Sequence, residues 1–251
     1  TRDSGYGGAA ERTQGRPTYG HHDPVRRSVR LLSDAATPLK KVCGINMTTV
    51  GAGPAQPVSQ FQPAHMPDSD ISLIHSALGP AWADNAREAL MTGVSWRTSS
   101  FQIFGRRIQS PRLIAWAGDH AYTYSRVTWS PAPWGATLRA IRDHVEELAG
   151  ASFNGVLLNL YRDGRDSMGW HSDDEPELGP QPVIASLSLG ASRRFVFRAR
   201  DNHAHICPVT LDHDSLLIMA GETQSNWQHA LPKSTKRMTA RINLTFRNID
   251  G

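Results

Sequence analysis

The segment "MGWHSDDEPEL", residues 168–178, places one histidine and four carboxylates within seven residues. Two kinds of structure fit this cluster. An acidic loop exposed to water is what most runs of Asp and Glu form. A metal site is the alternative, because a divalent cation offsets the repulsion between carboxylates and binds a neutral imidazole. The His171-x-Asp173 triplet alone is common by chance and leaves both interpretations open.

A mononuclear iron site of the facial-triad type needs a second histidine from a distant segment. The later part of the chain offers four: His203, His205, His213 and His229. The first three lie in "RDNHAHI" and "LDHDS", which are typical of a hairpin tip and a tight turn, so they have a simple interpretation as surface residues. His229 lies in "SNWQHALP", where a strand that ends before a proline would present it from a late β element.

The segment "TARINLTFRN" carries polar side chains at alternate positions: Arg241, Asn243, Thr245 and Arg247. In a strand these four share one face. If that face points into the core, two arginines are buried at a cost that only an anion would offset. If it points outward, the apolar residues between them form the core face instead. The pattern alone does not decide between the two.

The elements that must hold these residues are two helices followed by short strands. The spacing of Leu138, Ile141, Val145 and Leu148 predicts an amphipathic helix within 134–153, and a second helix is predicted within 77–96. Strand-like runs with a period of two follow at 156–163, 183–190, 193–200, 205–212, 215–221 and 241–248. We therefore expect a mainly β fold with flanking helices (α+β), a sandwich or jelly roll with both helices packed on one face.

Composition sets wider bounds. The 251 residues are 39% hydrophobic, enough for one core, and no apolar run reaches the roughly 20 residues that span a bilayer. The two cysteines, Cys43 and Cys207, have no C-x-x-C spacing and suggest neither a disulfide framework nor a zinc knuckle, which favours an intracellular setting. A net charge of +4 permits a polyanionic partner without requiring one.

Residues 1–66 are rich in Gly, Pro, Thr, Gln and Arg and have no Trp. We predict a largely disordered N-terminal tail there, followed by one domain over residues 67–251. Because Met47 could open a polypeptide of its own, some or all of residues 1–46 are expected to be dispensable.

The ordered set "NLYRDG", "MGWHSDDE", "IASLSLGASRRFVFR", "WQHALP" and "RINLTFR" resembles the AlkB family of Fe(II)- and 2-oxoglutarate-dependent nucleic acid demethylases. The resemblance runs from about residue 99 to 249 and is nearest to the branch that repairs duplex DNA. It implies a double-stranded β-helix, with Fe(II) held by His171, Asp173 and His229. It also implies that 2-oxoglutarate and O2 are co-substrates, with Arg241 and Tyr161 at one carboxylate, Arg247 beside Asn159 at the other, and Asn243 and Thr245 completing the pocket.

The same resemblance implies residues that meet the substrate. Glu175 matches the acidic position at the damaged base, where a carboxylate favours the cationic bases N1-methyladenine and N3-methylcytosine over neutral ones. Asp174 and Glu177 are then interpreted as solvated. Tyr122 and Tyr124 match an aromatic pair around a flipped base, although ordinary strand packing would also explain them.

The segment "FQIFGRR" matches a hairpin that probes the duplex. Phe104 would fill the gap left by the extruded base, with Arg106 and Arg107 near phosphates. A core phenylalanine is the alternative. The basic segment Lys233, Lys236 and Arg237 is either a backbone contact or a solvated loop.

The resemblance thus implies a DNA alkylation repair dioxygenase that oxidatively demethylates N-alkylated bases. The alternatives are a related oxygenase acting on RNA, protein or a small molecule, and a non-catalytic nucleic-acid-binding module. The expected partner is alkylated DNA or RNA, with no membrane. We expect a monomer, cytoplasmic if the source is bacterial and nuclear if it is eukaryotic.

Overall fold

The computed structural model describes residues 66–103, 106–124 and 127–250. The tail predicted over residues 1–66 lies outside this part of the chain except for Met66, so its disorder stays a prediction. Met66 itself is only 8% exposed and packs in a hydrophobic cluster with Ile71 and Trp227. The folded part therefore includes this last residue of the predicted tail.

Two antiparallel sheets form the body of the fold. The larger has seven strands in the order β1-β11-β8-β13-β6-β3-β2, and the smaller has four in the order β10-β9-β12-β7. The seven strands are β1 (Asp70–Ile74), β11 (Ser215–Ala220), β8 (Ile184–Gly190), β13 (Arg241–Arg247), β6 (Gly155–Tyr161), β3 (Arg106–Gly118) and β2 (Arg97–Ile103). The four are β10 (Ile206–Leu211), β9 (Arg193–Ala199), β12 (Trp227–Leu231) and β7 (Met168–His171). A short pair, β4 (Tyr122–Tyr124) and β5 (Val127–Trp129), stands apart.

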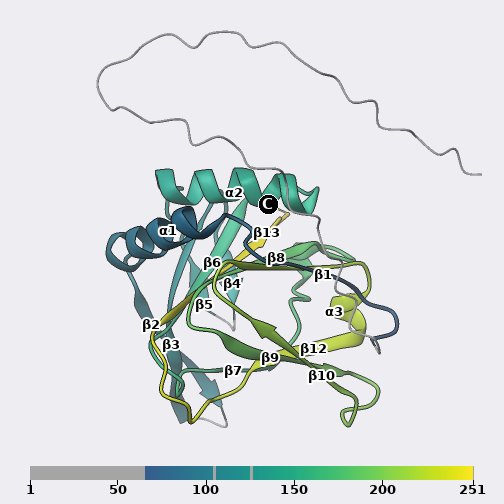
Figure 1. Ribbon diagram of the computed structural model, residues 1–251. Coiled ribbons are helices and arrows are strands. Elements are labelled where there is room, and N and C mark those ends of the chain that lie inside the picture. The colour runs from purple at the N-terminus through teal and green to yellow at the C-terminus, as the bar shows by residue number, and fades with distance from the viewer. Residues whose placement is uncertain (1–65, 104–105, 125–126, 251) are drawn as a thin grey trace, which may run out of the picture. The chain divides into compact units, whose positions relative to one another are not determined.

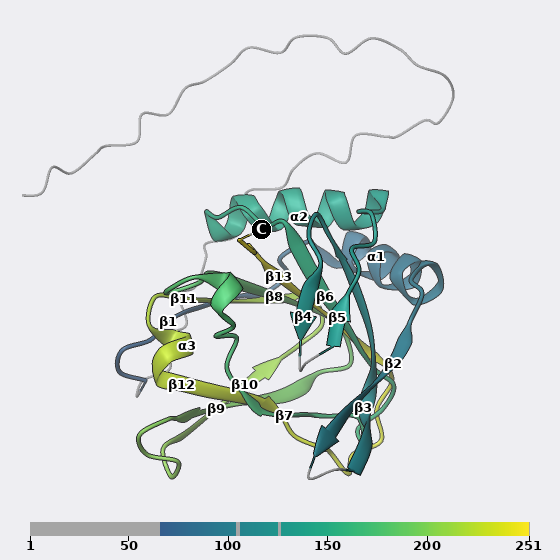
Figure 2. The ribbon, with the colours of Figure 1, turned by 180° about the vertical axis from the view of Figure 1, so that it is seen from behind.

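The two long helices pack on one face of the larger sheet, as Figure 1 shows. In β13 the side chains of Ile242, Leu244 and Phe246 point to this face and are fully buried. They meet the apolar stripes of helices α1 (Pro80–Gly93) and α2 (Ala136–Ala149) in one cluster. Figure 2 shows the smaller sheet on the opposite side, where a second hydrophobic cluster joins the two sheets. The predicted jelly roll with two helices on one face is confirmed.

The helices are shorter at both ends than the predicted segments. Helix α2 buries Leu138, Ile141 and Val145 as predicted, and ends at Gly150, whose φ of 63° is left-handed and easy only for glycine. Helix α1 begins at Pro80, whose ring suits the first helical turn. The two residues before Pro80, Leu78 and Gly79, donate their backbone amides to the carboxylate of the buried Asp214.

All six predicted strands are present, and the hairpin predicted in "FQIFGRR" is confirmed by the pairing of Ile103 with Arg106. Strand β3 runs much further than that motif and pairs with β6 over Leu113–Gly118. The β2–β3 register shifts next to Pro111, which has no amide to donate. Strands β1, β5 and β7 were not predicted; β7 has only four residues, too few for a period to be visible.

In the part of the chain with described coordinates, no helix is long and apolar enough to cross a membrane.

Candidate metal centre and co-substrate pocket

Strands β7 and β12 bring two distant histidines together. His171 is the last residue of β7, and the register pairs it with His229 on β12. Their Nε2 atoms are 3.1 Å apart. Asp173 follows two residues after His171, and its Oδ2 lies 3.8 Å from Nε2 of His229. One ligand atom from each of the three lies within 4.8 Å of the others, so the structure brings the predicted triad together.

Each of the three side chains is held by a different contact. Nδ1 of His171 is 2.9 Å from the carbonyl oxygen of Gly169. Because a carbonyl only accepts, Nδ1 carries the proton and the lone pair of Nε2 faces the site. Nη2 of Arg247 donates to Oδ1 of Asp173 at 2.6 Å, which leaves Oδ2 facing the histidines. His229 stacks on Phe195 with ring centroids 5.3 Å apart and an interplanar angle of 27°.

The protonation of this group suits a cation. Burial lowers the pKa of His229 to about 3, helped by repulsion from His171, and burial also lowers the pKa of His171. For Asp173 burial opposes ionisation, but Arg247 and the two histidines hold its pKa at about 2. At neutral pH the group therefore consists of two neutral imidazoles and one carboxylate, which is the state that metal binding requires.

Two imidazoles and one carboxylate on one side of an ion are the donor set of mononuclear non-haem iron. Two of the competing histidines make contacts elsewhere. The ring of His205 packs against Trp227, and Nδ1 of His213 accepts a hydrogen bond from the amide of Gly190. Among the described residues, no other group of three His, Cys, Asp or Glu side chains has metal-ligand spacing. The interpretation of His203, His205 and His213 as non-ligands agrees with their positions.

The polar face of β13 points inward. Arg241, Asn243, Thr245 and Arg247 are 2%, 7%, 7% and 1% exposed, and they line one pocket together with the triad. The alternative of an outward, solvated face is therefore wrong. The inward direction follows because the smaller sheet covers this side of β13 while helices cover the other.

Arg241 lies at the end of the pocket away from Asp173. Its Nη2 donates to Ser188 at 2.8 Å, and its guanidinium carbon is 5.3 Å from the centre of the Tyr161 ring. Its Nε is buried and has no hydrogen-bond partner among the described residues. Burial lowers the pKa of Arg241 to about 10. A buried guanidinium with a donor to spare fits a carboxylate that enters the pocket.

The expectation for Asn159 needs correction. We expected it beside Arg247, but the register places Asn159 opposite Asn243, whereas Arg247 is opposite Gly155. The side chain of Asn159 instead accepts from Nε of Arg112, on β3, at 2.6 Å. Arg247 reaches Asp173 from the other end of the strand.

Comparison with known proteins shows which enzyme superfamily this chain belongs to. Residues 70–247 match the 2OG-Fe(II) oxygenase superfamily, a range that contains both sheets. The chain belongs to this superfamily. The superfamily's description names two groups. His171, Asp173 and His229 fit Fe(II), and the buried guanidinium of Arg241, which has a donor to spare, fits a carboxylate of the kind that 2-oxoglutarate carries.

Relatives within the superfamily are AlkB homologues. The Bos taurus protein "Alpha-ketoglutarate-dependent dioxygenase alkB homolog 3" is 46% identical over 176 residues, covering 66% of this chain and 62% of that protein. The Homo sapiens protein "DNA oxidative demethylase ALKBH2" is 43% identical over 183 residues, covering 68% and 70%. The chain thus spans somewhat less than two thirds of the first relative, and the second, of which it covers more than two thirds, shows that it belongs to the AlkB family.

A solved structure described as "The structure of OsALKBH1" has the same fold. It superimposes with a TM-score of 0.57 at 16% sequence identity, covering 76% of this chain and all of that one.

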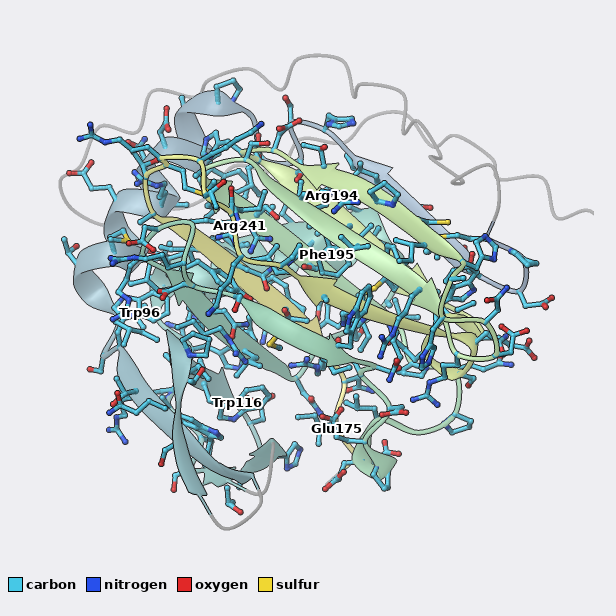
Figure 3. All side chains as sticks on the ribbon, turned by 90° about the horizontal axis from the view of Figure 1, so that it is seen from below. Trp96, Trp116, Glu175, Arg194, Phe195 and Arg241 are labelled. Carbon is cyan, nitrogen blue, oxygen red and sulfur yellow. The ribbon has the colours of Figure 1, made fainter. Side chains whose placement is uncertain are left out.

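Of the residues predicted to contact the damaged base or to form the probing hairpin in this AlkB-family member, only Glu175 has a described side chain. It is half-buried in the loop after β7, just before a turn of 3-10 helix, η1 (Pro176–Leu178), and is labelled in Figure 3. Asp174 and Glu177 are both exposed, as expected, and Asp174 also forms an ion pair with Arg200 at the surface. Phe104 and the side chains of Arg106, Arg107, Tyr122 and Tyr124 lie outside the described part. Lys233, Lys236 and Arg237 are exposed in the loop before β13.

Three residues that support the site were missed from the sequence. Phe195, on the inner face of β9, stacks on His229, and Figure 3 labels it together with Arg241 on the facing sheet. Arg112 and Gln224 are buried and contact Asn159 and Asp173. The strand period could have marked Phe195 as inward, but nothing in the sequence distinguishes Gln224 from a surface glutamine.

Proposed function

We propose that this chain is an Fe(II)- and 2-oxoglutarate-dependent dioxygenase that removes methyl groups from N-alkylated bases in nucleic acid. The observation that carries the proposal is the shared pocket: His171, Asp173 and His229 at one end and the buried guanidinium of Arg241 at the other. The printed names of the relatives, a 2-oxoglutarate-dependent dioxygenase and a DNA oxidative demethylase, support the same activity.

In this proposal the protein's residues orient two reactants. Arg241 and Tyr161 bind the distal carboxylate of 2-oxoglutarate, and Asn159, Asn243 and Thr245 form the wall between that carboxylate and the triad. Arg247 fixes the Asp173 carboxylate and also lines the pocket, where we assign it to the other carboxylate of 2-oxoglutarate. The metal supplies oxygen activation when bound. Overall, 2-oxoglutarate, O2 and the N-methyl group give succinate, carbon dioxide and an N-hydroxymethyl group. The bond between this group and the ring nitrogen then breaks, the carbon leaves as formaldehyde, and the ring nitrogen keeps the electron pair.

Selectivity for alkylated bases rests on charge. N1-methyladenine and N3-methylcytosine are cations, and the half-buried carboxylate of Glu175 lies two residues after the Asp173 ligand. A carboxylate beside the substrate base would favour such bases over neutral ones. The single observation behind this step is the position of Glu175 at the start of η1, on the loop that leaves the metal centre.

We assign three kinds of contact with the nucleic acid. Phe104 is the wedge, and Tyr122 and Tyr124 lie around the flipped base. Arg106 and the basic loop with Lys233, Lys236 and Arg237 bind phosphates. The β2–β3 hairpin beside Phe104 supports the wedge position. Phe104→Ala should then lower activity on duplex more than on single strands. We also propose that the enzyme acts as a monomer inside the cell, in the nucleus of a eukaryote or the cytoplasm of a bacterium.

Turnover of 2-oxoglutarate separates this function from its rivals. Succinate formation should rise several-fold with an oligonucleotide carrying one N1-methyladenine, compared with the unmethylated oligonucleotide or none. Equal succinate formation in all three would favour an oxygenase for protein or small molecules. No succinate under any condition would favour a non-catalytic module.

A further inference from the structure

Gln224 is a buried side chain that contacts the metal centre without being a ligand. It lies in the four-residue helix α3 (Thr223–Asn226), between β11 and β12, and is 2% exposed. Its Oε1 accepts a hydrogen bond from the backbone amide of Asp173 at 2.9 Å. Its Nε2 points to the sulfur of Met219 at 3.6 Å. Because an amide N–H can only donate, the oxygen end of Gln224 must face Asp173.

This contact restrains the one carboxylate of the metal centre. Asp173 follows a strand that ends at His171, so its backbone has no sheet partner of its own beyond that point. Two hydrogen bonds replace the sheet: Ser172 Oγ donates to the carbonyl of Trp227 at 3.0 Å, and the amide of Asp173 donates to Gln224. With its backbone held there and Oδ1 bound by Arg247, Oδ2 is the oxygen left toward the histidines.

Gln224 also joins the two ligand-bearing segments. Helix α3 leads directly into β12, and the amide of Trp227, its C-cap, donates to the carbonyl of Thr223. His229 lies two residues further along β12. The hydrogen bond between Gln224 and Asp173 therefore connects the Asp173 loop to β12, the strand that carries His229. A change at Gln224 would alter the distance between Asp173 and His229 and not merely the stability of a loop.

We propose that Gln224 is a positioning residue that sets the metal affinity of the triad by holding the backbone of Asp173. The inference rests on the proposed function in one respect, that the triad binds a divalent metal. Hydrogen bonds that orient ligands typically change metal affinity by about 10- to 100-fold when removed. Nothing in the sequence pattern assigns this role to a glutamine on a short helix.

The test is Mn(II) binding to the full chain, followed by electron paramagnetic resonance, because Mn(II) takes the same imidazole and carboxylate donors. Gln224→Met keeps a long unbranched side chain but has no acceptor for the amide. It should weaken Mn(II) binding by about 10- to 100-fold and broaden the spectrum of the bound ion. Gln224→Glu keeps an acceptor oxygen and should bind Mn(II) at least as tightly as the unchanged protein.

Thr223→Val is the matched control on the same helix. Thr223 is 1% exposed and exchanges hydrogen bonds with the backbone of Asp70, and neither residue lines the pocket that holds the triad. Its loss should lower the Tm while Mn(II) affinity stays within about twofold. Equal affinity in Gln224→Met and the unchanged protein, weakening by Gln224→Glu, or equal weakening by Thr223→Val would overturn the proposal. Normal Mn(II) binding without base demethylation would instead contradict the proposed function and leave the role of Gln224 standing.

Discussion

The Nε2 atoms of His171 and His229 lie 3.1 Å apart, opposite one another on β7 and β12, with the Asp173 carboxylate beside them. Two nitrogen lone pairs at this distance repel one another unless a proton or a cation lies between them. Burial disfavours the proton, because it lowers the pKa of both histidines. The arrangement is therefore stable with a metal ion, and five predictions follow for this centre and the pocket around it.

Asp173→Ala should abolish turnover and also destabilise the fold. The carboxylate is both the predicted anionic ligand and the partner of Arg247, and both side chains are almost fully buried. Removing one member of a buried ion pair costs about 3 kcal/mol or more. Urea unfolding measures the second effect and 2-oxoglutarate turnover the first.

Asp174→Ala is the control for this change, because Asp174 is the next residue but pairs with Arg200 at the surface. Turnover should stay within about twofold and stability within about 1 kcal/mol. Retained activity in Asp173→Ala with added iron would refute the ligand assignment.

Metal affinity should change little between pH 7.5 and 6.0. Histidines with an ordinary pKa near 6.5 would be largely protonated at pH 6.0, and two of them would weaken binding by about tenfold. In this protein burial takes the pKa of His229 to about 3, so His229 remains neutral over this range, and burial also lowers the pKa of His171, so His171 is protonated less than an ordinary histidine. Titration with Mn(II) at the two pH values measures the ratio of dissociation constants; a tenfold ratio would show that the histidines are ordinary ones.

Stability of the metal-free protein should fall as the solution becomes acidic. His229 takes up a proton near pH 6.5 in the unfolded chain but only near pH 3 in the folded protein, so protons favour unfolding across that interval. The Tm should therefore decrease steadily below about pH 6.5. In His229→Phe, which removes the titrating group, the decrease over this interval should be smaller.

Arg241→Lys should weaken 2-oxoglutarate binding. The substitution keeps the charge but loses the planar fork, and a hydrogen bond between charged groups contributes about 1.5 kcal/mol or more. We expect the KM for 2-oxoglutarate to rise about tenfold. Arg194→Lys is the control, since Arg194 is exposed on β9, and it should leave this KM unchanged. Figure 3 labels both arginines. A KM unaffected by Arg241→Lys would place the co-substrate elsewhere.

Glu175→Gln should reduce the preference for cationic bases. The change removes the negative charge and keeps the shape, so kcat/KM for an N1-methyladenine oligonucleotide should fall about tenfold while 2-oxoglutarate turnover without nucleic acid is unchanged. Glu177→Gln, an exposed carboxylate two residues on, should have little effect. If both substitutions give the same loss, Glu175 has no special place at the substrate.

The sequence predicts the framework of this site better than its surroundings. Alternating and helical periods locate the two long helices and six strands, because each of them contributes apolar residues to one or both of the two hydrophobic clusters. The direction of the polar face of β13 could not be predicted, since Ile242, Leu244 and Phe246 would form an equally good core face in either orientation. Only the presence of the smaller sheet decides it.

The supporting residues could not be predicted for a different reason. Gln224 and Arg112 act through contacts with segments 51 and 47 residues away in sequence. Such contacts depend on the final packing of strands and leave no local pattern. The pairing of Asn159 with Asn243 similarly depends on strand register, which a shift of a few residues would alter without changing the composition of either strand.

The central claim is demethylation of a base at the His171–Asp173–His229 centre. Its most direct test is formaldehyde release from an oligonucleotide carrying one N1-methyladenine, in single- and double-stranded form, with Fe(II), 2-oxoglutarate and ascorbate. We predict formaldehyde and restored adenine in equal amounts, dependent on 2-oxoglutarate and absent in His171→Ala. Methylated base left unchanged in both forms, while 2-oxoglutarate still binds at micromolar concentration, would contradict the claim and require a different substrate for this oxygenase.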